Sequence, residues 1–300
     1  MAEGSASSET GTVEPVELLD GPVWRARADA HRARVERWTL PHRERRRRHE
    51  AHPVMDFLFT YYSLRPVRLE EWHPGPGVAL RDAEEFLDRP GYVRDGDGLR
   101  LDPAQLPERL GSTAEFVRAL LVATASRPPR LGCFGLHEWA MVYRTDAPRH
   151  GAVPLRLGAA GTDAVVEQLP IHCTHHDAFR FFTVAARPLN ALTPERADQA
   201  EHEQPGCLHA TMDLYKWAYK LAPVTPSELL ADCFALAVDV RELDMRASPY
   251  DLADLGYPPV RIETPAGRAE YARAQAGFAE RAAPLRSRLV AVCDELAVTI

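Results

Sequence analysis

The sequence predicts a mainly α-helical (α+β) protein, formed as a single helical domain with a small β-hairpin element. Apolar residues recur at helical spacing over most of the chain, and N-cap and Thr-Pro signals mark several helix starts. Alternation of strands and helices, a Gly-rich dinucleotide fingerprint and a P-loop are all absent from the sequence, which disfavours nucleotide cofactors of those classes. We expect the domain to span residues 21–300 and to follow a disordered tail at residues 1–20, which begins with a Gly-, Ser-, Thr- and Glu-rich stretch.

The composition bounds the functional classes. A hydrophobic content of 45% with 26% charged residues is ordinary for a globular protein. The net charge of −7 argues against polyanion binding by the whole surface, although it leaves room for a local basic patch. The five cysteines are scattered and form no CxxC pair, and no signal peptide or membrane span is recognisable. We therefore expect a reduced, cytoplasmic protein without a membrane partner.

The first third of the chain predicts helices, a breaker and a hairpin. Helical character runs over residues 24–37, and a basic segment at 41–50 continues it with the arginines Arg45, Arg46, Arg47 and Arg48. A run of this kind is typical of an exposed helix face, and it is the candidate contact for phosphates. Pro53 can open a short aromatic helix, residues 72–77 indicate a loop, and residues 94–99 indicate a tight turn or hairpin.

The rest of the chain predicts further helices around one more β element. Residues 153–158 and 162–167 suggest two short strands joined by a Gly-Ala-Ala-Gly turn. Capping signals and apolar spacing predict the helices. They begin at Ser112, Thr193, Cys207, Thr225 and Thr264, and the last of them contains Pro284.

The helix expected over residues 207–220 is the most distinctive stretch. His209, Asp213, Lys216 and Lys220 recur on one polar stripe of it. The chain has only two lysines among its 36 Lys and Arg residues, and both lie here, one turn apart. This indicates either a task that arginine cannot perform, such as proton transfer or imine formation, or simply a solvated helix face.

Two polar sets are candidates for a site. The first joins the carboxylates Asp213 and Glu138, with His209 and Lys216, to aromatic side chains at Trp139, Tyr215 and Trp217. A carboxylate that activates water and an aromatic face that stacks on an extruded base are what N-glycosidic bond cleavage needs. The second set offers imidazole and carboxylate ligands for Zn, Fe or Mn. It consists of His172, His175, His176, His209 and Asp213.

Four segments resemble a family of bacterial proteins that is commonly labelled 3-methyladenine DNA glycosylase. They are residues 52–62 (HPVMDFLFTYY), 133–143 (CFGLHEWAMVY), 204–220 (QPGCLH and MDLYKWAYK) and 241–252 (RELDMRASPYDL). The resemblance extends over the chain from about residue 22. It implies a reaction without a mapped mechanism, because the helix-hairpin-helix turn of well-understood helical glycosylases is absent from the sequence.

The leading hypothesis is therefore a hydrolase that removes alkylated purines from damaged duplex DNA without a required cofactor. The alternative is a metal-dependent enzyme that acts on a small molecule through the histidine-rich set. A binding module without chemistry is the third option.

Overall fold

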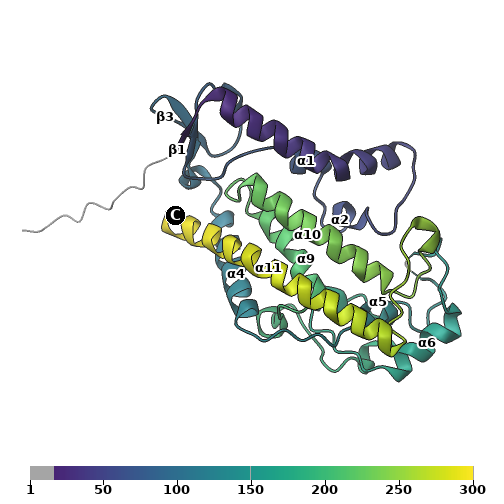
Figure 1. The fold of residues 1–300 in the computed structure, drawn as a ribbon. Coiled ribbons are helices and arrows are strands. Elements are labelled where there is room, and N and C mark those ends of the chain that lie inside the picture. The colour runs from purple at the N-terminus through teal and green to yellow at the C-terminus, as the bar shows by residue number, and fades with distance from the viewer. Residues whose placement is uncertain (1–16, 149, 300) are drawn as a thin grey trace, which may run out of the picture.

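The structure, a computed structural model, describes residues 17–148 and 150–299, and it confirms the mainly α-helical class. Three helices form the centre (Figure 1): α9 (Leu208–Lys220), α10 (Ser227–Arg246) and α11 (Pro265–Thr299) pack against one another. Helix α4 (Arg109–Ala125) covers α11 from the far side. Buried apolar side chains from all four helices belong to one hydrophobic core, so this core is the platform on which the polar groups described below are held.

The helix-start signals explain where two of the central helices begin. Helix α10 starts at Ser227, directly after the Thr225-Pro226 signal, and most of its side chains are buried. Helix α11 starts at Pro265, where the Thr264 hydroxyl accepts a hydrogen bond from the Gly267 backbone N–H at 3.1 Å. It continues through Pro284 as one helix.

Helix α1 (Gly21–Arg47) lies along α10 and ends beside the short helix α2 (Phe57–Thr60), as Figure 1 shows. The aromatic helix expected after Pro53 is thus limited to one turn. The remaining short helices are α3 (Pro66–Glu70), α5 (Leu136–Ala140), α6 (Gly158–Gln168), α7 (His176–Phe179) and α8 (Gln199–His202).

The β element is a four-stranded sheet rather than a lone hairpin. The expected hairpin is present as β3 (Tyr92–Asp95) and β4 (Gly98–Leu101). Strand β2 (Val78–Leu80) pairs antiparallel with β4, and β1 (Glu17–Leu19) pairs parallel with β2. Part of the expected disordered tail, residues 17–19, is therefore ordered in this sheet, whereas residues 1–16 lie outside the described residues.

Three local expectations are wrong. Residues 158–168 form α6 instead of a strand, because the buried Thr162, Val165 and Val166 follow helical spacing, and residues 153–157 contribute only one bridge, from Leu155 to Tyr250. The polar helix expected from Thr193 is reduced to α8. Helix α4 begins at Arg109, so the presumed cap Ser112 lies inside it.

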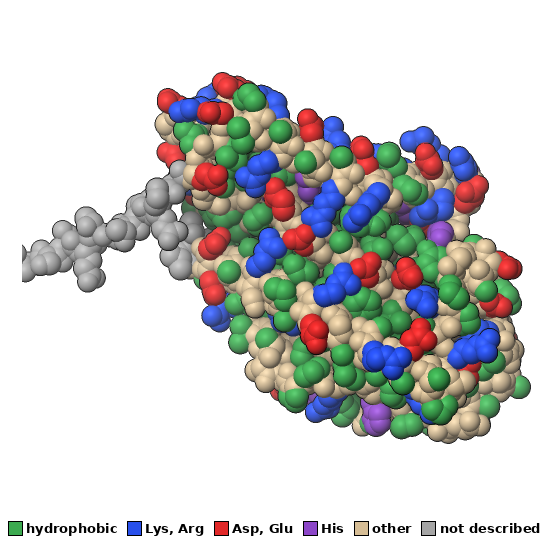
Figure 2. Space-filling view, in the orientation of Figure 1, with side chains coloured by type: hydrophobic (Ala, Val, Ile, Leu, Met, Phe, Trp, Pro, Cys, Tyr) green, Lys and Arg blue, Asp and Glu red, His purple; other side chains and the backbone are tan. Residues whose placement is uncertain are grey.

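The surface carries interspersed charges. On the face shown in Figure 2, Lys and Arg side chains alternate with Asp and Glu, and no broad region of one sign is visible. In the part of the chain that the structure describes, no helix has the length and apolarity needed to span a membrane.

Candidate functional site

A cavity of about 320 Å³ lies beside the N-terminal end of α9. This volume is at the lower end of the roughly 300–1,000 Å³ that small-molecule sites occupy. Tyr271 from α11 is one of the lining residues; its hydroxyl is fully buried and forms no hydrogen bond of ordinary geometry, although the Gly135 backbone N–H is nearby. Such an unsatisfied buried group indicates room for a polar ligand atom. The other lining residues are Arg130, Gly132, Cys133, His137, His172, Cys173, Thr174, Ala191, Leu192, Gln204, Cys207, Leu208 and His209.

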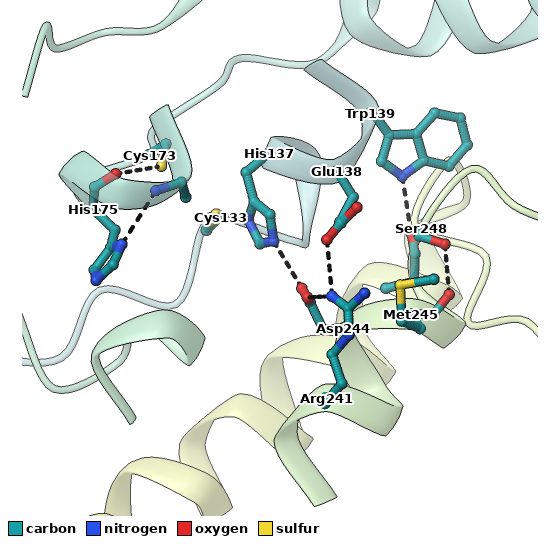
Figure 3. A network of polar contacts seen from close by, with 12 residues as sticks. Cys133, His137, Glu138, Trp139, Cys173, His175, Arg241, Asp244, Met245 and Ser248 are labelled. Carbon is teal, nitrogen blue, oxygen red and sulfur yellow. Dashed lines mark hydrogen bonds and ion pairs between the residues drawn. The ribbon is translucent and has the colours of Figure 1, made fainter. Parts of the chain in front are cut away.

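A thiol, an imidazole and a carboxylate stand in a row at this cavity (Figure 3). The Cys133 Sγ lies 3.5 Å from Nδ1 of His137, and Nε2 of His137 lies 2.7 Å from Oδ1 of Asp244. Burial alone would lower the pKa of His137, but the Asp244 carboxylate outweighs burial and raises this pKa well above its ordinary value of 6.5. Conversely, burial works to raise the pKa of Asp244, but His137 holds it below its usual range. The pair is therefore an imidazolium and a carboxylate near neutral pH.

The local backbone explains how Cys133 and His137 face one another. Phe134 has φ 49° and Gly135 has φ 71°, so two successive residues adopt the left-handed conformation before α5. Packing also favours glycine here, because a Cβ on Gly135 would lie 3.3 Å from the Cβ of Ala247, a tight contact. This turn presents the thiol to the ring that the first turn of α5 carries.

A buried arginine completes the row on the side away from the thiol. Arg241, one turn before Asp244 on α10, lies 2.9 Å from Asp244 Oδ2 and 3.0 Å from Glu138 Oε1. Its guanidinium also lies over the Phe57 ring, 4.1 Å from the centroid. Glu138, predicted as a catalytic carboxylate, is thus held in an ion pair and lines a separate small cavity of about 20 Å³.

His209 stands between two polar clusters. Its ring lies edge-on to His137 with centroids 4.5 Å apart and is stacked on His175 with centroids 5.2 Å apart. Burial, followed by the charge of His137, lowers the pKa of His209 well below 6.5, so this imidazole is neutral. His209, a predicted site residue, lines both the cavity of about 320 Å³ and the cavity of about 20 Å³.

The second cluster surrounds Asp213. This buried carboxylate accepts a hydrogen bond from the Tyr62 hydroxyl at 3.0 Å and pairs with Lys216 Nζ at 2.8 Å. His175 Nε2 lies 3.5 Å from Asp213 and 3.3 Å from Glu203. Burial works to raise the pKa of Asp213, but Lys216 and His175 hold it far below its usual range.

The protonation of His175 is set by the same carboxylates. Burial lowers the pKa of His175, but Asp213 and Glu203 outweigh burial and raise it to about 9. The Ala178 backbone N–H contacts Nδ1 of His175 at 3.3 Å. That contact needs a lone pair on Nδ1, so it exists only in the neutral ring and is given up by the imidazolium.

Lys216 behaves differently from the expectation for an imine-forming lysine. An imine-forming lysine needs a lowered pKa, which a neighbouring ammonium such as that of Lys220 would favour. Although burial acts in that direction, Asp213 at 2.8 Å and Asp177 at 3.2 Å raise the pKa of Lys216 above its ordinary value. Lys220 is the lysine whose pKa is lowered, first by partial burial and then by Lys216.

The predicted aromatic set is mostly core. Trp139 and Tyr215 are fully buried; the Trp139 Nε1 donates to the Ala247 carbonyl at 2.8 Å and the Tyr215 hydroxyl contacts the Leu58 carbonyl at 3.4 Å. A ring without an open face cannot stack on a base, so their expected role is corrected to a structural one. Trp217 lies under both lysines, 4.6 Å from Lys216 Nζ and 5.6 Å from Lys220 Nζ.

The arginine run lies apart from the cavity, at the C-terminal end of α1. Arg45 pairs with Asp56 at 2.6 Å, which leaves it committed to the fold. Arg46, Arg47 and Arg48 are exposed, where their charges also suit the negative end of the helix dipole.

The predicted metal set is not brought together as one group. His172 is exposed, and His175 and Asp213 meet with Glu203 rather than with His209. Two buried triplets do place one ligand atom each within 4.8 Å of one another, namely His137/His209/Asp244 and His175/Glu203/Asp213. Several of these potential ligand atoms already carry a proton or form an ion pair with another side chain.

In the first triplet, His137 Nε2 donates to Asp244, whose other oxygen binds Arg241. In the second, Lys216 occupies Asp213 Oδ2, and the raised pKa of His175 keeps a proton on Nε2, which faces Asp213 and Glu203. A metal ion would have to displace these partners. Proton transfer and ion pairing therefore suit both triplets better than metal ligation does.

The sequence reasoning missed Cys133, Asp244, Arg241 and Tyr271. Cys133 and His137 are four residues apart, a spacing that could have been noticed in the stretch 132–143. Asp244 could not have been assigned in this way, because it is separated from His137 by 107 positions and meets it only in the folded chain. Searches against family models, curated proteins and solved structures find no match to this chain.

Proposed function

We propose that the chain is a hydrolase that uses the thiol of Cys133 to attack a small electrophilic substrate in the 320 Å³ cavity. The observation that carries this proposal is the row from Cys133 through His137 to Asp244 at the wall of that cavity. A thiolate beside an imidazolium that a carboxylate orients is the arrangement that nucleophilic thiol catalysis requires. None of the three groups is exposed on a flat surface, so a bound substrate would meet them out of bulk water.

The residues suit the hydrolysis of an ester or amide. His137 Nδ1 carries the proton in the imidazolium and Cys133 reacts as the thiolate. The sulfur bonds to the carbonyl carbon, and the Nδ1 proton moves to the leaving oxygen or nitrogen as its bond to carbon breaks. Water then attacks the thioester carbon and gives a proton to Nδ1, and the sulfur leaves as the thiolate when the sulfur–carbon bond breaks. Asp244 keeps the ring oriented through Nε2 at 2.7 Å. Neutral His209, on the same cavity, is placed to accept a hydrogen bond from the attacking water.

The test is a turnover screen with small chromogenic esters and amides, with mass spectrometry of the protein during turnover. We expect a covalent acyl adduct on Cys133 and its loss in Cys133→Ala. The matched control is Cys233→Ala, which removes a buried thiol in α10 that does not line the cavity. Turnover that survives Cys133→Ala would contradict the proposal.

A second proposal is the hydrolysis of alkylated purines from damaged duplex DNA. It is supported by the resemblance, since the four segments that carry it meet around this site: they contribute Phe57 and Tyr62, Cys133 to Glu138, His209 and Asp213, and Arg241 and Asp244. An alkylated purine is a cationic leaving group, so its departure needs no proton donor. Glu138 beside the small cavity is then the carboxylate to stabilise the sugar cation and activate water.

The two proposals are separated by one assay. With methylated duplex DNA, release of base and formation of abasic sites are measured for wild type, Glu138→Gln and Cys133→Ala. Excision that depends on Glu138 and survives Cys133→Ala supports the glycosylase. The absence of abasic sites, together with an absence of duplex binding at low salt, contradicts it.

A further inference from the structure

A second cleft, of about 590 Å³, lies between α4, α7 and α9 at the opposite end of α9 from the thiol cavity. Both lysines of the chain line it, and neither proposed reaction uses the cleft. The lining residues are Ser112, Thr113, Phe116, His176, Asp177, Arg180, Arg196, Gln199, Lys216, Trp217 and Lys220. The cleft therefore gathers two lysines, two arginines and one carboxylate.

The cleft has more cationic than anionic side chains. Lys216 is neutralised by Asp213 and Asp177, and Arg180 lies 3.1 Å from Asp177. Lys220 and Arg196, in contrast, form no ion pair with any residue that the structure describes. Two uncompensated cations thus face one concave surface.

Neighbouring cations repel the ammonium group of Lys220. The Nζ of Lys220 lies 5.6 Å from the Trp217 ring centroid. Its pKa is lowered by partial burial, by Lys216 and, more weakly, by Arg196, while the carboxylates Asp213 and Asp177 act in the opposite direction. An anion placed between Lys220 and Arg196 would relieve this repulsion and raise the pKa of Lys220, so binding would take up protons at alkaline pH.

We propose that this cleft binds a phosphate monoester, with the phosphate between Lys220 and Arg196. Lys and Arg side chains that line one cleft can donate charge-assisted hydrogen bonds to phosphate oxygens. Ser112 supplies an exposed hydroxyl at the rim. Phe116 is 44% exposed and meets Trp217 edge-on with centroids 5.7 Å apart, so it offers an apolar surface to the organic part of the ligand. A mononucleotide has both parts in one molecule.

The first experiment is isothermal titration calorimetry with inorganic phosphate and with adenosine monophosphate. We expect both to bind, adenosine monophosphate more tightly, and Lys220→Gln to weaken both by about tenfold or more, as a charged hydrogen bond implies. Phe116→Ala should weaken adenosine monophosphate alone. The matched control is Arg118→Gln. This substitution removes one positive charge from α4, the helix that carries Phe116, at a residue that pairs with Asp294 and does not line the cleft.

Two outcomes would overturn the assignment. One is unchanged phosphate affinity in both Lys220→Gln and Arg196→Gln, each checked for an unaltered unfolding midpoint. The other is competition at the site by duplex DNA without binding of adenosine monophosphate, which would assign the cleft to a nucleic-acid backbone. Hydrolase or glycosylase activity is not measured in either arm, so the result is independent of the proposed functions.

Discussion

Replacing Asp244 by Asn tests the buried charge row directly. Asp244 is fully buried and binds His137 at 2.7 Å and Arg241 at 2.9 Å. Its loss leaves two buried cations with the single carboxylate of Glu138, and breaking a buried pair by removing one partner costs about 3–5 kcal/mol. Since Asn can keep one hydrogen bond, we expect the lower end of this range, about 3 kcal/mol, in the free energy of unfolding.

The matched control lies on the same helix. Asp239 pairs with Arg281 at 2.5 Å, but both side chains are about half exposed. Asp239→Asn should therefore cost no more than about 1 kcal/mol. Urea unfolding of both variants at the same pH gives the comparison, and an Asp244→Asn protein that loses no more stability than Asp239→Asn would refute the reasoning.

The difference in the free energy of unfolding between wild type and Asp244→Asn should also depend on pH. The pKa of Asp244 is depressed, so its contribution is present above the ordinary value of 3.8 and is lost as the pH falls through the folded value. The pKa of His137 is raised, so its contribution is complete below 6.5 and is lost as the pH rises through the folded value. The stability gap is therefore expected to be widest between these two ordinary values and to shrink in strong acid and strong base.

Three other substitutions extend the account. Lys216→Met should destabilise the fold by about 3 kcal/mol in urea unfolding, because it removes the nearer of the two cations beside buried Asp213 and leaves only His175. Borohydride should trap no imine on wild-type protein, and a trapped adduct at Lys216 would contradict the charged state assigned to it. Glu138→Gln should cost about 1–3 kcal/mol, measured by urea unfolding, because Arg241 loses one of its two carboxylates; an unchanged midpoint would show that this pair adds nothing. Burial lowers the pKa of His73 to about 4, so stability should be complete above 6.5 and fall by up to about 3 kcal/mol as the pH drops towards 4. His73→Phe should flatten that acid slope, and an equal slope in both proteins would assign it to other groups.

The helical frame is largely predictable because its signals are local. The Thr225-Pro226 start of α10, the Thr264-Pro265 start of α11 and the hairpin at residues 92–101 all depend on neighbours in sequence. The sequence predicts a strand at residues 162–167 because small residues at the start of α6 obscure its helical periodicity. Buried Thr162, Val165 and Val166 fit a helix, but the Gly-Ala-Ala-Gly start looks like a turn.

Only the part of the site that lies within one helix could be predicted from the sequence. The polar stripe of α9 is present, with Asp213 and Lys216 in contact, because a helix fixes the spacing of its own side chains. What the stripe contacts is tertiary information: His209 meets His137 and His175 from two other segments, and Asp213 meets Tyr62 from a third. The expectation that Trp139 stacks on a base is wrong for the same reason. In the sequence, an aromatic residue beside a carboxylate gives the same pattern whether it lines a pocket or lies in the core.

The reactivity of Cys133 tests the central claim most directly. Burial raises the pKa of the Cys173 and Cys293 thiols to about 12, and it raises those of Cys207 and Cys233 as well, so these four should react slowly. Iodoacetamide labelling, resolved by site with mass spectrometry and repeated across pH, gives the rate at each thiol.

We predict that Cys133 is alkylated first by a wide margin at neutral pH. His137→Asn should slow its alkylation by about 10²-fold, on the scale of a lost acid–base partner. The control Cys233→Ala should leave the rate at Cys133 unchanged. Alkylation of Cys133 that is no faster than that of the buried cysteines, or that is indifferent to His137→Asn, would contradict the thiol–imidazole–carboxylate assignment.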